Sequence, residues 1–468
     1  MVIINIYKLK GIFMHGPLAT LILSLFLFAT AAKAQPPGTV IVDGKTYPAT
    51  SQGIQSAVKA CGSLTSCGGV YLPPGTYKIT SPITPKSNIS IFGAGKGITI
   101  LQGGVPYGAD FLYSSATPLT NLTISDLTID LQQVSLASGI QLSNVSGSTI
   151  SNVAFKNGAA KGWFLYYGST GNPATDPVQN FNNTVKGVDF SNHAGSLEAF
   201  LVFNSQFTTI SNITLTNITS PGIGLWQKDY DTQITGVSCS NSSAQDGVVY
   251  YSISVERTII ANLKTNNCGP AVKGANISDY GTFGLTQAQN LVISNPVLIG
   301  GPNSQQNPAI QLGAVNNALV QNPQISFYQI GILLDDGNVT GPVTGPALGA
   351  STNWAIVGGT IRDNNASKDY NLIHPGILFM GSGGRQYGAV QGVQIYDDQK
   401  SPTQTYPIVF DGAASFDNIS ITGNRLSAFD GATSVATGDG ASIGESTMIW
   451  CNTNYAGSNP PQTSATCN

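Results

Sequence analysis

The sequence predicts an all-β fold in which short parallel strands stack into a solenoid, a parallel β-helix. The first observation is a six-residue phrase of the kind Ile124-Ser-Asp-Leu-Thr-Ile129, which returns eleven times. Its copies start 24 to 36 residues apart, at Ile124, Ile150, Val185, Ile210, Ile234, Ile260, Ile293, Val320, Ile356, Val390 and Ile421. A minimum period with insertions added is typical of stacked coils that bury their apolar sides against one another.

The third position of each phrase predicts where the chain turns. It holds only Asp, Asn or Gly, at Asp126, Asn152, Gly187, Asn212, Gly236, Asn262, Asn295, Asn322, Gly358, Gly392 and Gly423. These residue types tolerate a left-handed backbone, so we expect a sharp corner there. We also expect a ladder of side-chain amides between coils, formed by Asn262, Asn295 and Asn322.

A second apolar strand follows most phrases. These strands are expected at 139–142, 162–165, 199–202, 222–225, 247–250, 309–312, 331–334, 376–379 and 407–410. With one strand on each side of the corner, a coil then has three strands. We therefore expect three parallel sheets with rungs ~4.8 Å apart and an interior filled by Ile, Val, Leu and Phe.

The two ends of such a solenoid expose strand edges that need covering. At the N-terminal end, residues 50–61 start with a capping Thr and place apolar residues at helical spacing, which predicts a short capping helix. We expect one β-helix domain over residues 35–450 and an irregular tail over residues 451–468. Only 9% of residues are charged, as expected of many strands and tight turns.

The N-terminal 34 residues predict export. Lys8 and Lys10 precede an apolar stretch over residues 18–31, and Ala-Lys-Ala at 32–34 is typical of a signal-peptide cleavage site. We therefore expect a secreted, extracellular or periplasmic protein with no membrane span after cleavage. The remaining chain has 17 basic and 23 acidic residues, so nucleic acid is not an expected partner.

Six cysteines in an exported chain favour disulfides. The pairs nearest in sequence or on neighbouring coils are Cys61–Cys67, Cys239–Cys268 and Cys451–Cys467, among 15 possible connectivities. His193 and His374 have no partner at a ligand spacing, so no metal site is predicted.

The first coils resemble a known superfamily. The segments Gly68-Gly-Val-Tyr-Leu-Pro-Pro-Gly-Thr-Tyr-Lys-Ile79, Ile89-Ser-Ile-Phe-Gly-Ala-Gly95 and Ile98-Thr-Ile-Leu101 resemble the opening of pectate lyase-like, right-handed parallel β-helix proteins. That superfamily includes polygalacturonase- and rhamnogalacturonase-like hydrolases, uronate lyases, epimerases, phage tailspikes and adhesins, so the resemblance implies the fold more strongly than the reaction. The Gly-His-Gly, Arg-Ile-Lys and Asn-Thr-Asp motifs of polygalacturonases are missing.

Two carboxylates are candidates for catalysis. The resemblance implies that hydrolase carboxylates lie at the start of the second strand, where Gln245-Asp246-Gly-Val-Val matches the hydrolase pattern. The same column contains Lys161 and Glu198. Glu198 and Asp246 lie two coils apart, roughly 10 Å by the rung spacing, which suits an inverting hydrolase. We assign Asp246 as acid and Glu198 as base; the alternative is that both are solvated turn residues.

An outward aromatic row is expected beside these carboxylates. Alternation along the second strand places five rings on one face, where they would bind sugar rings or form a small core under a loop: Phe164, Tyr166, Phe203, Trp226 and Tyr251. Lys161 would assist substrate binding. Asp229 and Asp231 would contribute to a sugar site or to Ca²⁺ binding, or lie in a solvated turn.

The function expected from these residues is cleavage of a polysaccharide by glycoside hydrolysis. The alternatives are a uronate lyase or epimerase, in which Lys161 or Lys273 would act as base with help from Ca²⁺, and a non-catalytic carbohydrate-binding or adhesin-like β-helix. For a hydrolase we expect no cofactor. The acidic mature chain offers no broad basic groove for a polyuronate, which favours hydrolysis.

Overall fold

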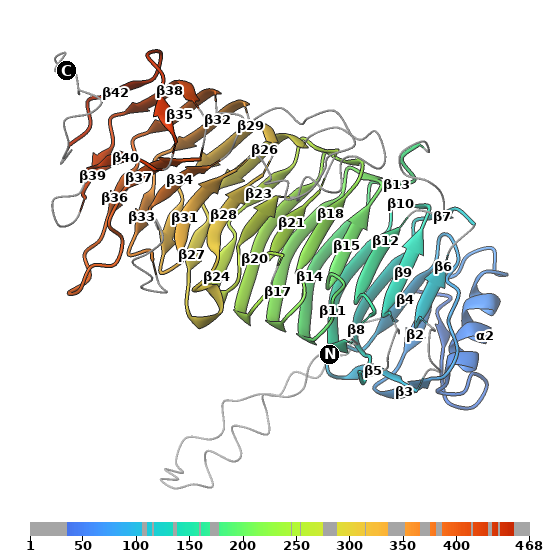
Figure 1. The fold of residues 1–468 in the computed structure, drawn as a ribbon. Coiled ribbons are helices and arrows are strands. Elements are labelled where there is room, and N and C mark those ends of the chain that lie inside the picture. The colour runs from blue at the N-terminus through green and yellow to red at the C-terminus, as the bar shows by residue number, and fades with distance from the viewer. Residues whose placement is uncertain are drawn as a thin grey trace, which may run out of the picture. The chain divides into compact units, whose positions relative to one another are not determined.

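The computed structural model of the chain describes residues 35–104, 110–114, 117–133, 138–158, 161–168, 177–244, 246–252, 254–274, 288–313, 315–335, 352–365, 375–380, 386–412, 415–428, 433–438 and 440–453. The residues from 37 onward belong to one body. Its strands stack along one axis from the N-terminal to the C-terminal coils (Figure 1), and neighbouring strands pair in parallel. The fold is the right-handed parallel β-helix predicted from the repeat.

The second apolar strands form a sheet of twelve strands along one side of the solenoid. They are β6 (Leu112–Ser114), β9 (Ile140–Ser143), β12 (Leu165–Gly168), β15 (Phe200–Phe203), β18 (Ile223–Trp226), β21 (Val249–Tyr251), β25 (Val272–Gly274), β28 (Pro308–Leu312), β31 (Ile330–Leu334), β34 (Ile377–Met380), β37 (Ile408–Asp411) and β40 (Val435–Thr437). Each strand from β9 to β37 pairs with its copies in the coils before and after it, and β6 and β40 form the two edges.

The phrases and the short strands beside them form a second sheet of thirty strands. They are β1 (Val40–Ile41), β2 (Val70–Leu72), β3 (Gly75–Ile79), β4 (Ser90–Gly93), β5 (Thr99–Gly103), β7 (Leu119–Thr120), β8 (Thr123–Asp130), β10 (Val145–Ser146), β11 (Thr149–Gly158), β13 (Asn180–Phe181), β14 (Thr184–His193), β16 (Ser205–Gln206), β17 (Thr209–Ile218), β19 (Asp229–Tyr230), β20 (Gln233–Ser242), β22 (Val255–Glu256), β23 (Ile259–Ala261), β24 (Lys264–Cys268), β26 (Ala288–Ser294), β27 (Val297–Ile299), β29 (Val315–Gln321), β30 (Gln324–Ser326), β32 (Thr352–Val357), β33 (Thr360–Arg362), β35 (Gln386–Gln391), β36 (Gln394–Tyr396), β38 (Ser415–Thr422), β39 (Arg425–Leu426), β41 (Ser442–Ile443) and β42 (Met448–Trp450). A short 3₁₀ turn, η3 (Pro302–Ser304), lies between β27 and β28.

We expected three parallel sheets, but the described residues form two. Strands such as β11 and β14 continue through the corner, so the two sides that the corner separates belong to one bent sheet. All eleven corner residues have a positive φ of 50–69°, as predicted from their identity. The phrases stack in the expected register, for example Ile124 beside Ile150 and Ile150 beside Val185.

Side-chain amides link the corners of neighbouring coils. Asn322 Nδ2 donates to Asn295 Oδ1 at 3.2 Å, which forms one step of the predicted ladder. A further ladder joins Asn192 to Asn157 and Asn217 to Asn192. These bonds satisfy polar groups at turns that no sheet hydrogen bond reaches.

The N-terminal end carries the predicted helix, α2 (Ser51–Cys61), which lies across the first coils (Figure 1). The Thr50 hydroxyl accepts from the Gly53 N–H at 3.2 Å, and the apolar face with Ile54 and Val58 is fully buried. Disulfides join Cys61 to Cys67 and Cys239 to Cys268, as predicted. The expected signal peptide at 1–34, the end of the tail and Cys467 lie outside the described residues.

Apolar side chains fill the interior of the coils. In the middle coils Phe155 stacks on Phe190 with ring centroids 5.2 Å apart, and further along Phe379 stacks on Phe410 at 4.7 Å. Equivalent rings on successive rungs lie one above another, which adds a stacking contribution to the burial of apolar area. In the described part of the chain, no helix is long and apolar enough to cross a membrane.

Candidate active site

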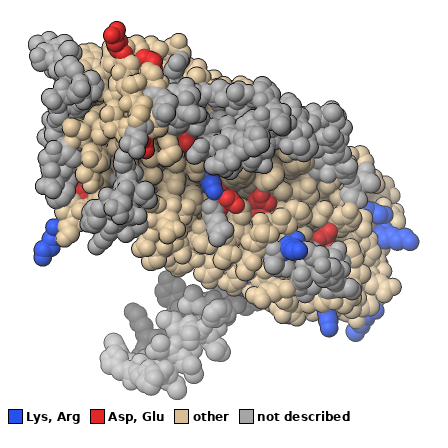
Figure 2. All heavy atoms as spheres, in the orientation of Figure 1, with Lys and Arg blue, Asp and Glu red and all other residues tan. Residues whose placement is uncertain are grey.

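A pocket of about 490 Å³ opens on the outer face of the twelve-stranded sheet, over β12, β15, β18 and β21. On the face that Figure 2 shows, acidic and basic side chains lie side by side near the middle of the solenoid. The pocket is lined by Trp163, Tyr166, Ser196, Leu197, Glu198, Leu201, Phe203, Pro221, Trp226, Asp246 and Tyr250. It thus combines both predicted carboxylates with aromatic side chains.

Glu198 is the buried carboxyl of this pocket, with 6% of its surface exposed. The indole N–H of Trp163 donates to its Oε2 at 3.2 Å. A Cβ on Gly224 would lie 2.7 Å from Glu198 Cγ. Because Gly224 has no side chain, the side chain of Glu198 can lie across β18, the next rung. This glycine is required for space, since any larger residue would displace the carboxyl.

Burial raises the pKa of Glu198 above its ordinary value, because loss of water penalises the charged form. The nearby Asp246 carboxylate raises it further, whereas the Trp163 hydrogen bond lowers it. The Trp226 indole N–H makes the smallest contribution and also lowers it. Glu198 therefore retains its proton to a higher pH than a solvated glutamate.

Asp246 has a different environment at the rim of the pocket. Its side chain is 53% exposed and its Oδ1 forms a 2.9 Å ion pair with Lys273 Nζ on β25. Since β15 pairs with β18 and β18 with β21, Glu198 and Asp246 lie two rungs apart. Their backbones are therefore separated by roughly 10 Å along the axis of the solenoid. Two carboxyls thus lie in one pocket, one of them desolvated and the other solvated and ion-paired.

Aromatic rings flank the carboxyls in two pairs. Trp163 stacks on Tyr166 with centroids 4.6 Å apart, and Trp226 packs against Tyr250 at 5.9 Å. Tyr166, Phe203 and Trp226 line the pocket at outward positions of the sheet, as their alternation predicted. Sequence reasoning missed Trp163 and Tyr250, although both lie within the apolar runs that were identified as strands.

The outward orientation predicted for Phe164 and Tyr251 is wrong. Both side chains are almost fully buried inside the coil. The register of β12 places Leu165 beside Ile140, two residues later than expected, and the register of β21 places Val249 beside Ile223, one residue later. A one-residue slip exchanges the two faces of a strand, so Tyr250 takes the outward place expected for Tyr251. The two-residue shift of β12 keeps its faces but leaves Phe164 before the first residue of the strand, where alternation does not fix its direction, and its ring packs against Phe155 and Phe190.

Lys161 and Asp229 are also corrected by the structure. Lys161 is exposed and does not line the pocket, and Trp163 occupies its place in the column that contains Glu198. Asp229 is completely buried inside the coil, where its Oδ2 accepts from the Trp226 N–H at 2.9 Å and burial raises its pKa well above the ordinary value. Asp231 instead forms an ion pair with Arg257. Asp229 and Asp231 therefore point to opposite sides and do not form a common Ca²⁺ site.

His193 lies beneath the pocket. Its Nε2 lies 2.8 Å from the Gly162 carbonyl oxygen, to which it donates, and its Nδ1 accepts from the Ser220 hydroxyl at 2.7 Å. Burial lowers its pKa, so the ring is neutral. By bonding residues next to Trp163 and Pro221, the histidine positions the floor of the pocket. The other isolated histidine, His374, lies outside the described residues.

Comparison with known proteins agrees with this architecture. A family model described as "Rhamnogalacturonase A/epimerase, pectate lyase-like" matches residues 43–273, a range that includes both carboxyls and every lining residue of the pocket. The chain belongs to the pectate lyase-like superfamily. A preneck appendage protein of Bacillus phage PZA is 31% identical over 120 residues, which is 25% of this chain but only 14% of the phage protein.

Two solved structures of other proteins are similar to this chain in fold. The A-module of the mannuronan C-5 epimerase AlgE6 from Azotobacter vinelandii is 15% identical, with a TM-score of 0.51 over 84% of this chain and 95% of that module. A variant catalytic domain of a GH87 α-1,3-glucanase, in complex with nigerose, has the same identity and TM-score over 90% of this chain and 70% of its own. At this identity the likeness shows a common fold and not a common reaction.

Proposed function

We propose that this protein is a carbohydrate-active enzyme that hydrolyses a glycosidic bond of a polysaccharide, with Glu198 and Asp246 as the catalytic pair. The observation that carries the proposal is the presence of two carboxyls in different environments within one aromatic-lined pocket. Their two-rung separation suits inversion, because room remains between them for a sugar and a water molecule. The family description and the sugar-active proteins of similar fold support the same substrate class.

The environments favour the opposite roles to those expected from the sequence. Glu198 is buried with a raised pKa, which suits a general acid that protonates the leaving oxygen as the glycosidic C–O bond breaks. Asp246 is solvated and paired with Lys273, which suits an ionised base that accepts a proton from the attacking water. The water oxygen bonds to the anomeric carbon as the leaving oxygen departs, so the configuration inverts.

The cations of the site favour hydrolysis over β-elimination. Elimination at a uronate needs a base and a positive group near the substrate carboxylate. Lys273 is engaged by Asp246, and Lys161 lies outside the pocket. The described lining contains two acids and no Lys or Arg, so a neutral polysaccharide fits the charge of the pocket better than a polyuronate.

The second candidate is a non-catalytic carbohydrate-binding β-helix. The paired rings Trp163–Tyr166 and Trp226–Tyr250 favour it, because flat apolar surfaces bind sugar faces without any catalytic group. Under either function we infer export, on the basis of the N-terminal segment and of the disulfides Cys61–Cys67 and Cys239–Cys268.

One experiment separates these functions. The protein is incubated with pectic, alginate and neutral polysaccharides while new reducing ends, unsaturated products and binding are measured. New reducing ends alone indicate hydrolysis, unsaturated products indicate a lyase, and binding with neither supports the non-catalytic candidate. Glu198→Gln and Asp246→Asn should each lower turnover by about 10²- to 10⁴-fold while retaining binding.

The matched control is Asp411→Asn, at the end of β37 on the same sheet but outside the pocket lining. It should leave turnover unchanged. Normal turnover in both Glu198→Gln and Asp246→Asn would exclude the pair, and retention of configuration in the product would exclude the inverting mechanism.

A further inference from the structure

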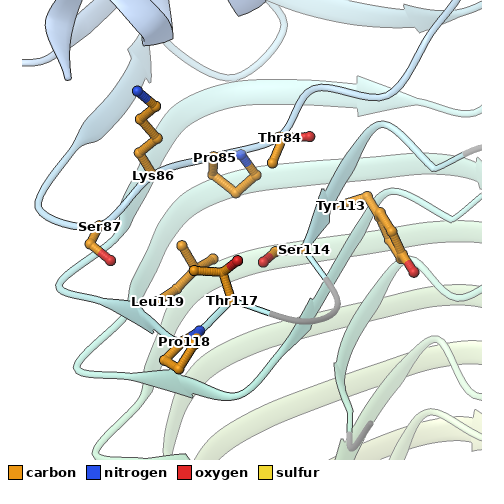
Figure 3. A pocket seen from close by; sticks show the side chains of 9 residues that line it. All are labelled: Thr84, Pro85, Lys86, Ser87, Tyr113, Ser114, Thr117, Pro118 and Leu119. Carbon is orange, nitrogen blue, oxygen red and sulfur yellow. The ribbon is translucent and has the colours of Figure 1, made fainter. Parts of the chain in front are cut away.

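A second pocket, of about 610 Å³, lies near the N-terminal end of the solenoid. It is formed where the chain leaves β6 and where the preceding coil makes the same turn, and it is lined by Thr84, Pro85, Lys86, Ser87, Tyr113, Ser114, Thr117, Pro118 and Leu119. Figure 3 shows Tyr113 on one side of the pocket and Lys86 with Ser87 on the opposite side. None of these residues belongs to the candidate active site.

This pocket shares a column of outward side chains with the active site. Tyr113 pairs with Gln141, and Gln141 pairs with Tyr166, so the tyrosines of the two pockets occupy the same outward position two rungs apart. From β6 to β21 there are five rungs, about 24 Å at the spacing of parallel strands. A saccharide chain lying along this face in its extended form would reach both pockets.

The lining suits an uncharged sugar unit. Tyr113, Pro85 and Pro118 offer flat apolar surfaces, and the hydroxyls of Thr84, Ser87, Ser114 and Thr117 offer hydrogen bonds. The lining contains no acid. Its basic residue, Lys86, extends toward the C-terminal end of α2, where a Cβ on Gly62 would lie 3.1 Å from Nζ. There the ammonium group interacts favourably with the helix dipole.

The capping helix holds one wall of this pocket in place. Gln55 of α2 accepts from the Thr84 N–H at 2.7 Å through Oε1 and donates to the Thr84 carbonyl oxygen at 3.3 Å through Nε2. Ser87 Oγ accepts from the Thr120 N–H at 3.0 Å, which joins the same wall to β7. The pocket is therefore built by the cap as well as by the coils, with one wall fixed by hydrogen bonds from both.

We propose that this pocket is a distal subsite that binds a neutral sugar unit of the polysaccharide cleaved between Glu198 and Asp246, three to five rungs away. The inference rests on the proposed function and extends it to the length and charge of the substrate. Since one rung and one extended pyranose unit are similar in length, about six units span the distance from Tyr113 to Asp246. The enzyme should thus prefer long chains to short ones.

The test compares oligosaccharides of graded length. Binding and turnover of neutral α-1,3-gluco-oligosaccharides with two to ten units are measured for the wild type and Tyr113→Ala, with oligogalacturonates of the same lengths as the charged comparison. Tyr113→Ala should weaken binding of the neutral eight- to ten-unit chains by about tenfold and leave two- to three-unit chains unaffected. The control is Tyr387→Ala, an exposed tyrosine on β35 outside both pocket linings, which should change neither.

The outcomes distinguish the two proposals. Length-dependent loss in Tyr113→Ala without any cleavage would refute hydrolysis and support the distal subsite. Cleavage of neutral chains by the wild type with no loss in Tyr113→Ala, or with equal loss on short and long chains, would overturn the subsite and leave hydrolysis in place. Tighter binding of oligogalacturonates than of neutral chains would overturn its neutral character. Failure of the wild type to bind either series would overturn both. Thermal unfolding of each variant verifies that it is folded.

Discussion

The outward positions of the twelve-stranded sheet differ between the middle and the C-terminal coils. In the middle coils they hold Tyr166, Leu201, Gly224 and Tyr250, which surround the buried Glu198. In the C-terminal coils the same column holds three buried apolar residues, which pack with Ile330, Met380, Tyr406 and Ala436: Leu333, Leu378 and Val409. The same outward column thus lines the pocket that contains the carboxyls in one region and forms a small apolar core in the other.

This difference shows what the fold leaves free. Backbone hydrogen bonds between rungs and the inward apolar residues hold both regions together in the same way. The outward column contributes little to that framework, so its residues are determined by what covers or occupies the face. Similar coils therefore carry chemistry in one place and none in another.

Among the substitutions that test this comparison, the largest effect is expected from adding a side chain at Gly224. Gly224→Ala should displace the Glu198 carboxyl and lower turnover by about 10²-fold, because catalytic groups tolerate only small misplacement. Steady-state kinetics with thermal unfolding as the control will measure it. The double variant Gly224→Ala/Glu198→Gln should lose no more than Glu198→Gln alone. Additive losses would show that Gly224 acts in some other way.

The next prediction tests the comparison directly. Leu378→Ala should lower the free energy of unfolding by about 2 kcal/mol through loss of buried contacts, and should leave saccharide binding intact. Tyr250→Ala should weaken binding more than stability, because its ring faces the pocket. Denaturant unfolding and binding titrations on both variants will decide. If both substitutions changed the free energy of unfolding and saccharide binding to the same extent, the proposed difference between the middle and the C-terminal coils would be wrong.

A smaller effect concerns pH. If Glu198 is the acid, turnover should fall as the pH rises through its raised pKa, because the deprotonated form has no proton to give. Trp163→Phe removes a hydrogen bond that favours the charged form, so the falling limb should move to higher pH. The pH–rate profiles of the two proteins test this. Turnover that rises with pH through the same group would instead identify Glu198 as the base.

The smallest effect, a change of stability with pH, is expected from His193, whose ring forms hydrogen bonds in the middle coils. Its pKa is lowered in the folded state, so the unfolded chain binds more protons below the ordinary histidine pKa. Its contribution to stability is therefore present at neutral pH and is lost as the pH falls below that value. Unfolding curves at several pH values should show this loss in the wild type. A His193→Gln variant should show a weaker dependence on pH in that range.

The repeat was sufficient to predict the coils, their corners and the register of the phrases. A corner residue such as Asn152 is identified by its tolerance of positive φ, and the alternation around it leaves one choice of inward side. Glu198 and Asp246 could be placed in one region because stacking brings the starts of successive second strands together. The capping helix followed from its N-cap residue and the spacing of Ile54 and Val58.

The remaining site residues could not be predicted, for identifiable reasons. The runs Trp163–Tyr167 and Val248–Tyr251 are apolar throughout, so no alternation fixes which residues face inward. Asp229 follows Gln227 and Lys228, which both have positive φ, and this turn directs a carboxyl into the interior. The room that Gly224 leaves for Glu198 depends on a contact between neighbouring rungs, which sequence spacing alone does not reveal.

Glu198, Gly224 and Asp246 lie on three consecutive turns of the solenoid, at or just before β15, β18 and β21. The backbone distance between Glu198 and Asp246 is therefore a whole number of strand spacings. Excising one complete turn, the 24 residues from Ile210 through Gln233, would bring β15 beside β21. The carboxyl-bearing turns would then be one strand apart, about 4.8 Å, close to the 5–5.5 Å of enzymes that form a covalent glycosyl intermediate. In a parallel β-helix the spacing between site residues on different turns therefore changes in steps of one strand spacing.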